Sequence, residues 1–181
     1  VYLDFSRASG GSGSLEENFN NYCGMVMDLF GKVYEPYYFP GFAQKMEEQP
    51  DFVSKLNYLN LHAAESGMRL YLIIDEYDNF TNIVLNEQGK AIYHALTHAS
   101  GFYREIFKKF KGMFERIFMT GVSPVTLDDL TSGFNIGWNI STDYQFNMML
   151  GFSETDVRTM FQYYKDAVQL TIDTDIEAII R

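Results

Sequence analysis

The run Leu70–Ile74 is the feature of the sequence that most restricts its fold. It consists of five apolar residues in succession, begins shortly after Gly67 and ends in a cluster of acids. A short continuous apolar run of this kind is typical of a parallel strand that is covered on both faces. We therefore expect a layered fold that contains a parallel sheet.

Segments with strand and helix patterns alternate along the rest of the chain. Residues 1–6 and 114–120 have the composition of two further strands. Ser14 and Glu17 have the spacing of a capping box, which predicts the start of an amphipathic helix. The other expected helices are a pair over 41–66, a long helix over 89–111 and a helix over 153–164. This alternation predicts an α/β fold, a mostly parallel sheet flanked by helices, as one domain over residues 1–181.

The charge balance argues against a general affinity for nucleic acid. The chain has 24 acidic and 14 basic residues and a formal net charge of -10, which gives no overall attraction to phosphates. Lys108, Lys109 and Lys111 form the one dense basic group, and we interpret them as the solvated face of a helix.

The cysteine count and the hydropathy pattern indicate the compartment. Cys23 is the single cysteine, so an intrachain disulfide is excluded and a reducing environment is favoured. The longest apolar stretches fall well short of the ~20 residues that span a bilayer. We expect a cytoplasmic protein without a membrane segment.

Polar residues follow two of the expected strands. Asp75, Glu76 and Asp78 come directly after the first, and Thr120 and Ser123 come after the second. Ligands of parallel sheets bind beyond the carboxyl ends of the strands. Two readings stay open, a ligand site or a pair of ordinary capped turns with solvated acids.

An apolar strand that ends in Asp-Glu has the Walker B arrangement. In it, Asp75 holds the shell of a Mg²⁺ ion between two phosphates, and Asp78 either reinforces that shell or caps the following turn. Glu76 then orients and deprotonates the attacking water. A hydroxyl on the neighbouring strand, from Thr120 or Ser123, senses the γ-phosphate or the water.

Three segments resemble a known family. They are LYLIIDEYDN (70–79), RIFMTGVSPVTLDDLTSGFNIGWNIST (116–142) and LGFSETDV (150–157), and they resemble the bacterial AAA-ATPase-like family. The resemblance implies a P-loop ATPase, often followed by a PD-(D/E)XK nuclease-like domain. It also implies that Asp75 is the Mg²⁺-shell acid, Glu76 the catalytic base, and Thr120 or Ser123 the sensor. Asp128, Asp129 and residues 132–135 match the family pattern without a physical role that we can assign.

The phosphate-binding loop of that family has no counterpart in the sequence. Gly31-Lys32-Val33 and Gly89-Lys90-Ala91 lack the hydroxyl that would bind Mg²⁺ and the preceding glycine. We therefore expect a partial domain, the Walker B half of a longer protein, that lacks its N-terminal strand and loop. Alone it should bind ATP and Mg²⁺ poorly, because most phosphate affinity comes from that loop.

Two function classes remain open. The first is an ATP-binding and hydrolysing module of a larger bacterial ATPase. An oligomeric state is compatible with this function. The second is a degenerate module that acts as a binding or regulatory scaffold. A zinc site at His94 and His98 is disfavoured because no third ligand suggests itself. The aromatic cluster over residues 34–42 is interpreted as packing.

Overall fold

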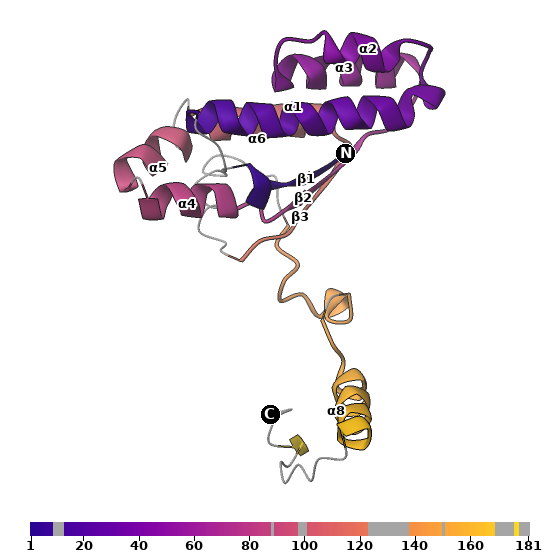
Figure 1. The fold of residues 1–181 in the computed structure, drawn as a ribbon, viewed down its shortest axis with the longest axis vertical. Helices are drawn as coiled ribbons and strands as arrows, with labels where there is room; N and C mark the ends of the chain where they lie inside the picture. Colours follow the sequence, from indigo (N-terminus) through magenta and orange to yellow (C-terminus); the bar gives the residue numbers. More distant parts are fainter. Residues whose placement is uncertain are drawn as a thin grey trace. The chain divides into compact units, whose positions relative to one another are not determined.

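The computed structural model describes residues 1–8, 13–87, 89–97, 101–122, 138–149, 151–168 and 176–177 (Figure 1). The chain divides into two compact units, residues 1–136 and residues 137–181. No helix among the residues described is both long enough and apolar enough to cross a membrane.

In the first unit, short strands alternate with groups of helices. The strands are β1 (Tyr2–Asp4), β2 (Tyr71–Asp75) and β3 (Arg116–Met119). The helices between β1 and β2 are α1 (Leu15–Tyr34), α2 (Phe42–Glu47) and α3 (Phe52–Glu65). Those between β2 and β3 are α4 (Asn79–Glu87), α5 (Lys90–Thr97) and α6 (Phe102–Met113). Short 3₁₀ helices follow β1 (Phe5–Arg7) and α1 (Glu35–Tyr37).

The strands form one parallel sheet in the order β1-β2-β3, with β2 in the centre. Ile74 of β2 lies opposite Leu3 of β1 on one side and Met119 of β3 on the other. All three strands therefore end at the same edge (Figure 1). The predicted α/β fold with a parallel sheet is confirmed.

The sheet buries one face and exposes the other. Leu3, Leu72 and Ile74 are buried, with at most 1% of their surface exposed. On the other face, between 38% and 53% of the surface is exposed for Tyr2, Tyr71, Ile73 and Phe118. Both connections step in the same direction across the sheet, and right-handed crossovers then place both groups of helices on the same face. The prediction that the strand at 70–74 is covered on both faces is therefore wrong for this unit.

An aromatic cluster forms the centre of the core. Phe19 packs edge-to-face against Phe5, Phe80 and Tyr103, with ring centroids 5.1, 5.4 and 5.7 Å away. All four rings are fully buried, and they join the 3₁₀ helix after β1 to α1, α4 and α6. Cys23 is buried in the same core, as the apolar run around it indicates.

Helix α1 begins with the predicted capping box. The Glu17 carboxylate accepts the Ser14 amide at 2.8 Å, and the Ser14 hydroxyl accepts the Glu17 amide at 3.2 Å. The helical pair predicted over 41–66 is present as α2 and α3, which pack on α1 (Figure 1). Buried Lys55 of α3 ties the three helices, since it pairs with Asp28 of α1 and donates to the Met46 carbonyl of α2 at 2.9 Å.

The long helix predicted over 89–111 is divided into α5 and α6. Gly101 precedes α6 with φ -59° and ψ 140°, which is not helical. A side chain at Gly101 would come within 2.3 Å of the Leu96 carbonyl oxygen. The backbone at Gly101 is therefore not helical, and periodicity alone does not predict this because apolar residues continue at helical spacing on both sides.

The second unit contains a 3₁₀ helix (Tyr144–Phe146) and helix α8 (Glu154–Val168). Trp138, the one tryptophan of the sequence, packs edge-to-face on Phe146 with ring centroids 5.4 Å apart. Arg158 forms ion pairs with Glu154 at 2.6 Å and Glu177 at 2.7 Å. The helix predicted over 153–164 is thus confirmed.

Candidate functional site at the carboxyl edge of the sheet

The ends of β2 and β3 are joined by three hydrogen bonds. The Thr120 hydroxyl donates to Oδ1 of Asp75. The Thr120 amide donates to the Ile74 carbonyl at 2.9 Å, and the Tyr77 amide donates to the Thr120 carbonyl at 3.0 Å. The structure therefore brings together two of the predicted site residues, Asp75 and Thr120, which are 45 positions apart in the sequence.

The Asp75 carboxylate accepts hydrogen bonds at both oxygens. Besides Thr120, the Glu76 amide donates to Oδ1 at 3.1 Å, and the Tyr2 hydroxyl donates to Oδ2 at 3.1 Å. The bond from Thr120 is the largest cause that lowers the pKa of Asp75, and the bonds from Tyr2 and Glu76 act in the same direction against the effect of burial. Asp75 is therefore ionised at neutral pH, as a cation ligand must be.

Glu76 lies in a left-handed backbone conformation. Its φ is +51°, and among the described residues it is the one non-glycine residue with positive φ. Such a conformation costs about 1 kcal/mol for a residue with a Cβ. The carboxylate is exposed at the sheet edge and accepts the Asn79 side-chain amide at 2.9 Å. Strain of this kind is frequent at functional sites.

Asp78 faces the interior rather than solvent. Only 2% of its surface is exposed. Its Oδ1 accepts the Val122 amide at 3.2 Å, and its Oδ2 accepts the Asn82 side-chain amide at 3.1 Å. Asp78 therefore holds the segment after β3 against the start of α4. The sequence predicts that Asp78 contributes to the Mg²⁺ shell. For this, its two oxygens would have to bind the ion or its water in addition to Val122 and Asn82.

Gly121 permits the close approach of the two strand ends. A Cβ at this position would lie 2.5 Å from Cε1 of Tyr77 and 2.6 Å from Oδ1 of Asp78. Tyr77 is itself held from the core, because the buried Tyr103 hydroxyl donates to its carbonyl at 2.6 Å. The turn Thr120-Gly121 is thus packed on the acidic segment after β2.

Two residues at this edge were not predicted from sequence. Asp4 is the register partner of Asp75 on β1, and its carboxylate accepts the Ser6 amide at 3.1 Å and the Ser6 hydroxyl at 2.6 Å. Tyr2 lies on the same face, two residues earlier. The signal was the alternation in β1, but only the register with β2 shows which side chains meet. Ser123, Asp128, Asp129 and residues 132–135 lie outside the described residues.

Few side chains in the described part of the chain are arranged as metal ligands. No three His, Cys, Asp or Glu side chains gather there as the ligands of an ion would. A Mg²⁺ ion in a phosphate-transfer site takes one or two carboxylates and completes its shell with water and phosphate. The Asp75 carboxylate fits that more modest requirement. The zinc site at His94 and His98, which the sequence disfavours, is not tested, because His98 lies outside the described residues.

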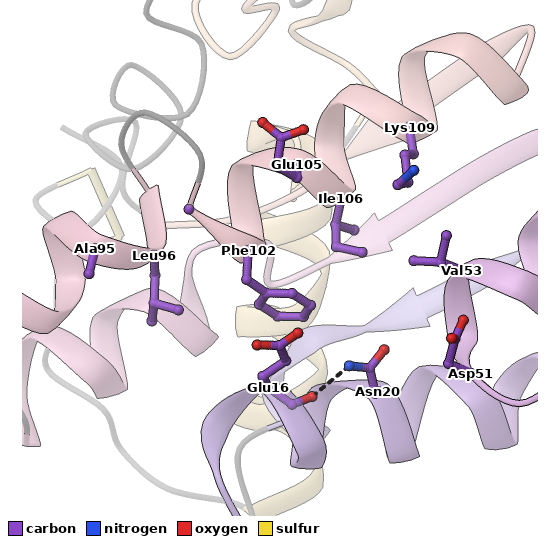
Figure 2. Close-up of a pocket in the computed structure, with 11 residues that line it drawn as sticks. Glu16, Asn20, Asp51, Val53, Ala95, Leu96, Phe102, Glu105, Ile106 and Lys109 are labelled. Carbon is purple, nitrogen blue, oxygen red and sulfur yellow. Dashed lines mark hydrogen bonds between the residues drawn. The ribbon is translucent and has the colours of Figure 1, made fainter.

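A groove of about 600 Å³ lies away from this edge (Figure 2). Its apolar floor includes Phe102 and Ile106 of α6, and carboxylates of Glu16 and Glu105 stand at its rim. Its lining residues come from the α1, α3, α5 and α6 regions, and none from the ends of β2 and β3. Of the basic group, Lys108 pairs with Glu105 at 2.5 Å, while Lys109 lines the groove.

Part of the aromatic cluster at 34–42 packs as expected, whereas Tyr34 and Tyr37 are exposed. Tyr38 stacks on Phe42 with ring centroids 4.0 Å apart, and Phe42 stacks on Tyr58 of α3 at 5.2 Å. Phe42 is fully buried. The cluster therefore attaches α2 and the preceding loop to α3.

The fold and the site define an α/β protein whose polar residues gather at the carboxyl edge of a parallel sheet. A comparison with known protein families matches residues 1–131 to the AAA-ATPase-like family, described as a predicted AAA-ATPase. The chain belongs to this family. Comparisons with curated proteins and with solved structures gave no match.

Proposed function

We propose that this chain is the Walker B and sensor portion of an ATP-binding and hydrolysing P-loop module in a larger bacterial protein. The observation that carries the proposal is the contact between Asp75 and Thr120. It joins an ionised carboxylate to a hydroxyl at adjacent ends of parallel strands, where ligands of such sheets bind. Membership of the AAA-ATPase-like family supports the same function.

Each residue of the edge has a part in this proposal. Asp75 binds the shell of Mg²⁺, which supplies charge neutralisation on the transferred phosphate when bound. Glu76 is exposed beside it and accepts a proton from the attacking water. Thr120 reports the state of the γ-phosphate through its bond to Asp75, and Ser123 is the alternative hydroxyl. Asp78 holds the two strand ends together and is the second candidate for the Mg²⁺ shell.

We propose that a segment outside these 181 residues supplies the phosphate-binding loop. The two Gly-Lys pairs are not loops, since Gly31 and Lys32 lie within α1 and Lys32 pairs with Glu47 at 2.6 Å. Gly89 directly precedes α5 and carries no following hydroxyl. Because β1 and β3 are the edge strands of the described sheet, a further strand would pair outside one of them.

Nucleotide turnover by the full-length protein tests the proposal. Glu76→Gln should lower ATP turnover about 100-fold or more, the typical contribution of a general base, and should leave ATP binding intact. Asp75→Asn should weaken the dependence on Mg²⁺. Glu115→Gln is the matched control, because Glu115 adjoins the opposite end of β3 and pairs with exposed Arg69 at 3.2 Å. Equal turnover by the wild type and Glu76→Gln would remove Glu76 from the role of base.

A non-catalytic scaffold is the second candidate. Three contacts favour it: the Glu76 carboxylate accepts from Asn79, and buried Asp78 accepts from Val122 and Asn82. A scaffold would bind nucleotide or a partner with no turnover, and Glu76→Gln would then change neither. Measurement of ATP binding and hydrolysis on the same samples separates the two candidates.

A further inference from the structure

Tyr2 lies next to the proposed site on a strand that the Walker B pattern does not include. Tyr2 is opposite Ile73 in the register of β1 and β2, so Asp75 is its diagonal neighbour on the same face of the sheet. Long aromatic side chains can reach a diagonal neighbour on the next strand. The Tyr2 hydroxyl donates to Oδ2 of Asp75 at 3.1 Å.

The remaining contacts of Asp75 give this bond a specific consequence. Oδ1 already accepts the Thr120 hydroxyl and the Glu76 amide. A carboxylate oxygen offers about two acceptor positions, so among the residues that the structure describes Oδ1 is filled and Oδ2 retains one. Tyr2 therefore fixes both the rotation of the carboxylate and the direction of its one remaining acceptor position.

We propose that Tyr2 is a positioning residue for Asp75 and that it directs Oδ2 toward the cation or its bound water. This rests on the proposed function for the identity of the ligand, but not for the contact itself. Tyr2 is half exposed on the open face of the sheet, so its ring contributes little to the core, and a change at its hydroxyl acts through Asp75. Mutation of the hydrogen-bond partner of a metal ligand typically lowers metal affinity about 10-fold to 100-fold.

Tyr2→Phe removes the hydroxyl and keeps the ring. Tyr71→Phe is the matched control, because Tyr71 lies on the same face of the sheet with 50% exposure and four residues before Asp75. Side-chain NMR of the 181-residue chain measures the rotamer order of Asp75 in each variant. We expect a single rotamer in the wild type and in Tyr71→Phe, and averaging between rotamers in Tyr2→Phe. An unchanged Asp75 rotamer in Tyr2→Phe would overturn the proposal.

The second measurement uses the full-length protein with an ATP analogue and Mn²⁺ as the probe. Tyr2→Phe should weaken Mn²⁺ binding by roughly 10-fold, with no change in Tyr71→Phe. If Tyr2→Phe makes Asp75 mobile but the variant still binds Mn²⁺ with the wild-type affinity, the proposal that Tyr2 directs Oδ2 toward the cation is wrong. If neither wild type nor variants bind Mn²⁺ or nucleotide, the proposed function fails, and the rotamer measurement still decides whether Tyr2 positions Asp75.

Discussion

At the scale of single residues, the edge of the sheet depends on a few positions that restrict side-chain size or backbone conformation. Asp75 is bound by donors from β1, from its own turn and from the residue after β3. Gly121 lets the last of these come close enough, because its missing side chain leaves room for Tyr77. The geometry of the site therefore depends on the absence of a side chain at Gly121 as well as on the polar groups.

Gly121→Ala should destabilise the protein. The new methyl group would meet Tyr77 and Asp78 at 2.5–2.6 Å, and overpacking of this kind costs roughly 1–3 kcal/mol. Urea unfolding measures the loss. Gly112→Ala is the control, because a side chain there in α6 meets nothing within 4 Å, and we expect it to stabilise the helix by up to about 1 kcal/mol. Equal effects at the two positions would contradict the contact.

At the scale of elements, the three helices between β1 and β2 are joined by one buried charge. Lys55 is 6% exposed and is satisfied by Asp28 and by the Met46 carbonyl. The capping box fixes where α1 begins. Lys55 determines how stability responds to the loss of a buried charge, and the capping box determines how stability depends on pH.

Lys55→Met should destabilise the protein by about 3 kcal/mol, because removal of one partner leaves Asp28 partly buried without its cation. Lys32→Met is the control. Lys32 and Glu47 form an exposed pair at 2.6 Å, and exposed pairs contribute less than about 1 kcal/mol. Chemical denaturation of both variants tests the comparison, and a loss at Lys32 as large as at Lys55 would contradict it.

The capping box predicts an acid-dependent part of the stability. Hydrogen bonds from Ser14 lower the pKa of Glu17. A lowered folded-state pKa means that the stabilisation is present above the unfolded-state pKa and is lost as pH falls through the folded-state value. Glu17→Gln should therefore flatten the dependence of stability on pH in the acid range. Thermal unfolding between pH 3 and about 6 measures this dependence in the wild type and in Glu17→Gln.

Much of the fold and less of the site could be predicted from sequence. The apolar run at 70–74, the capping box and the two strand ends correspond to observed elements because local pattern determines them. Asp75 and Thr120 lie at two strand ends that the sequence indicates as neighbours, because parallel strands end at a common edge. Tyr2, Asp4 and the buried state of Asp78 could not be predicted, since register and side-chain direction depend on packing between segments distant in sequence.

At the scale of the whole molecule, the open face of the sheet is the feature with the broadest effect. Tyr2, Tyr71, Ile73 and Phe118 form an exposed apolar surface on a parallel sheet, which is usually covered on both faces. Apolar surfaces of this kind favour association. The sequence pattern alone gave the opposite expectation, because it shows only that both faces of β2 are apolar.

Ile73→Thr should reduce the binding of a hydrophobic dye and concentration-dependent association of the chain. The β-branched shape is kept, so the strand should persist, while the apolar surface becomes smaller. Dye fluorescence and sedimentation velocity measure the two effects. Tyr37→Ser is the control, since Tyr37 is 68% exposed but lies outside the sheet. A larger change at Tyr37 would show that the sheet face is not the main apolar surface.

The two rarest residue types, Cys23 in the first unit and Trp138 in the second, provide separate natural probes. Burial raises the pKa of the Cys23 thiol well above its usual value, so a thiol reagent can modify it only when the core opens. Trp138 is 68% exposed, and its fluorescence follows only its own surroundings. The protein therefore needs no engineered probe to follow the two units separately during denaturation. The rate of thiol modification reports on the first unit, and the indole emission reports on the second.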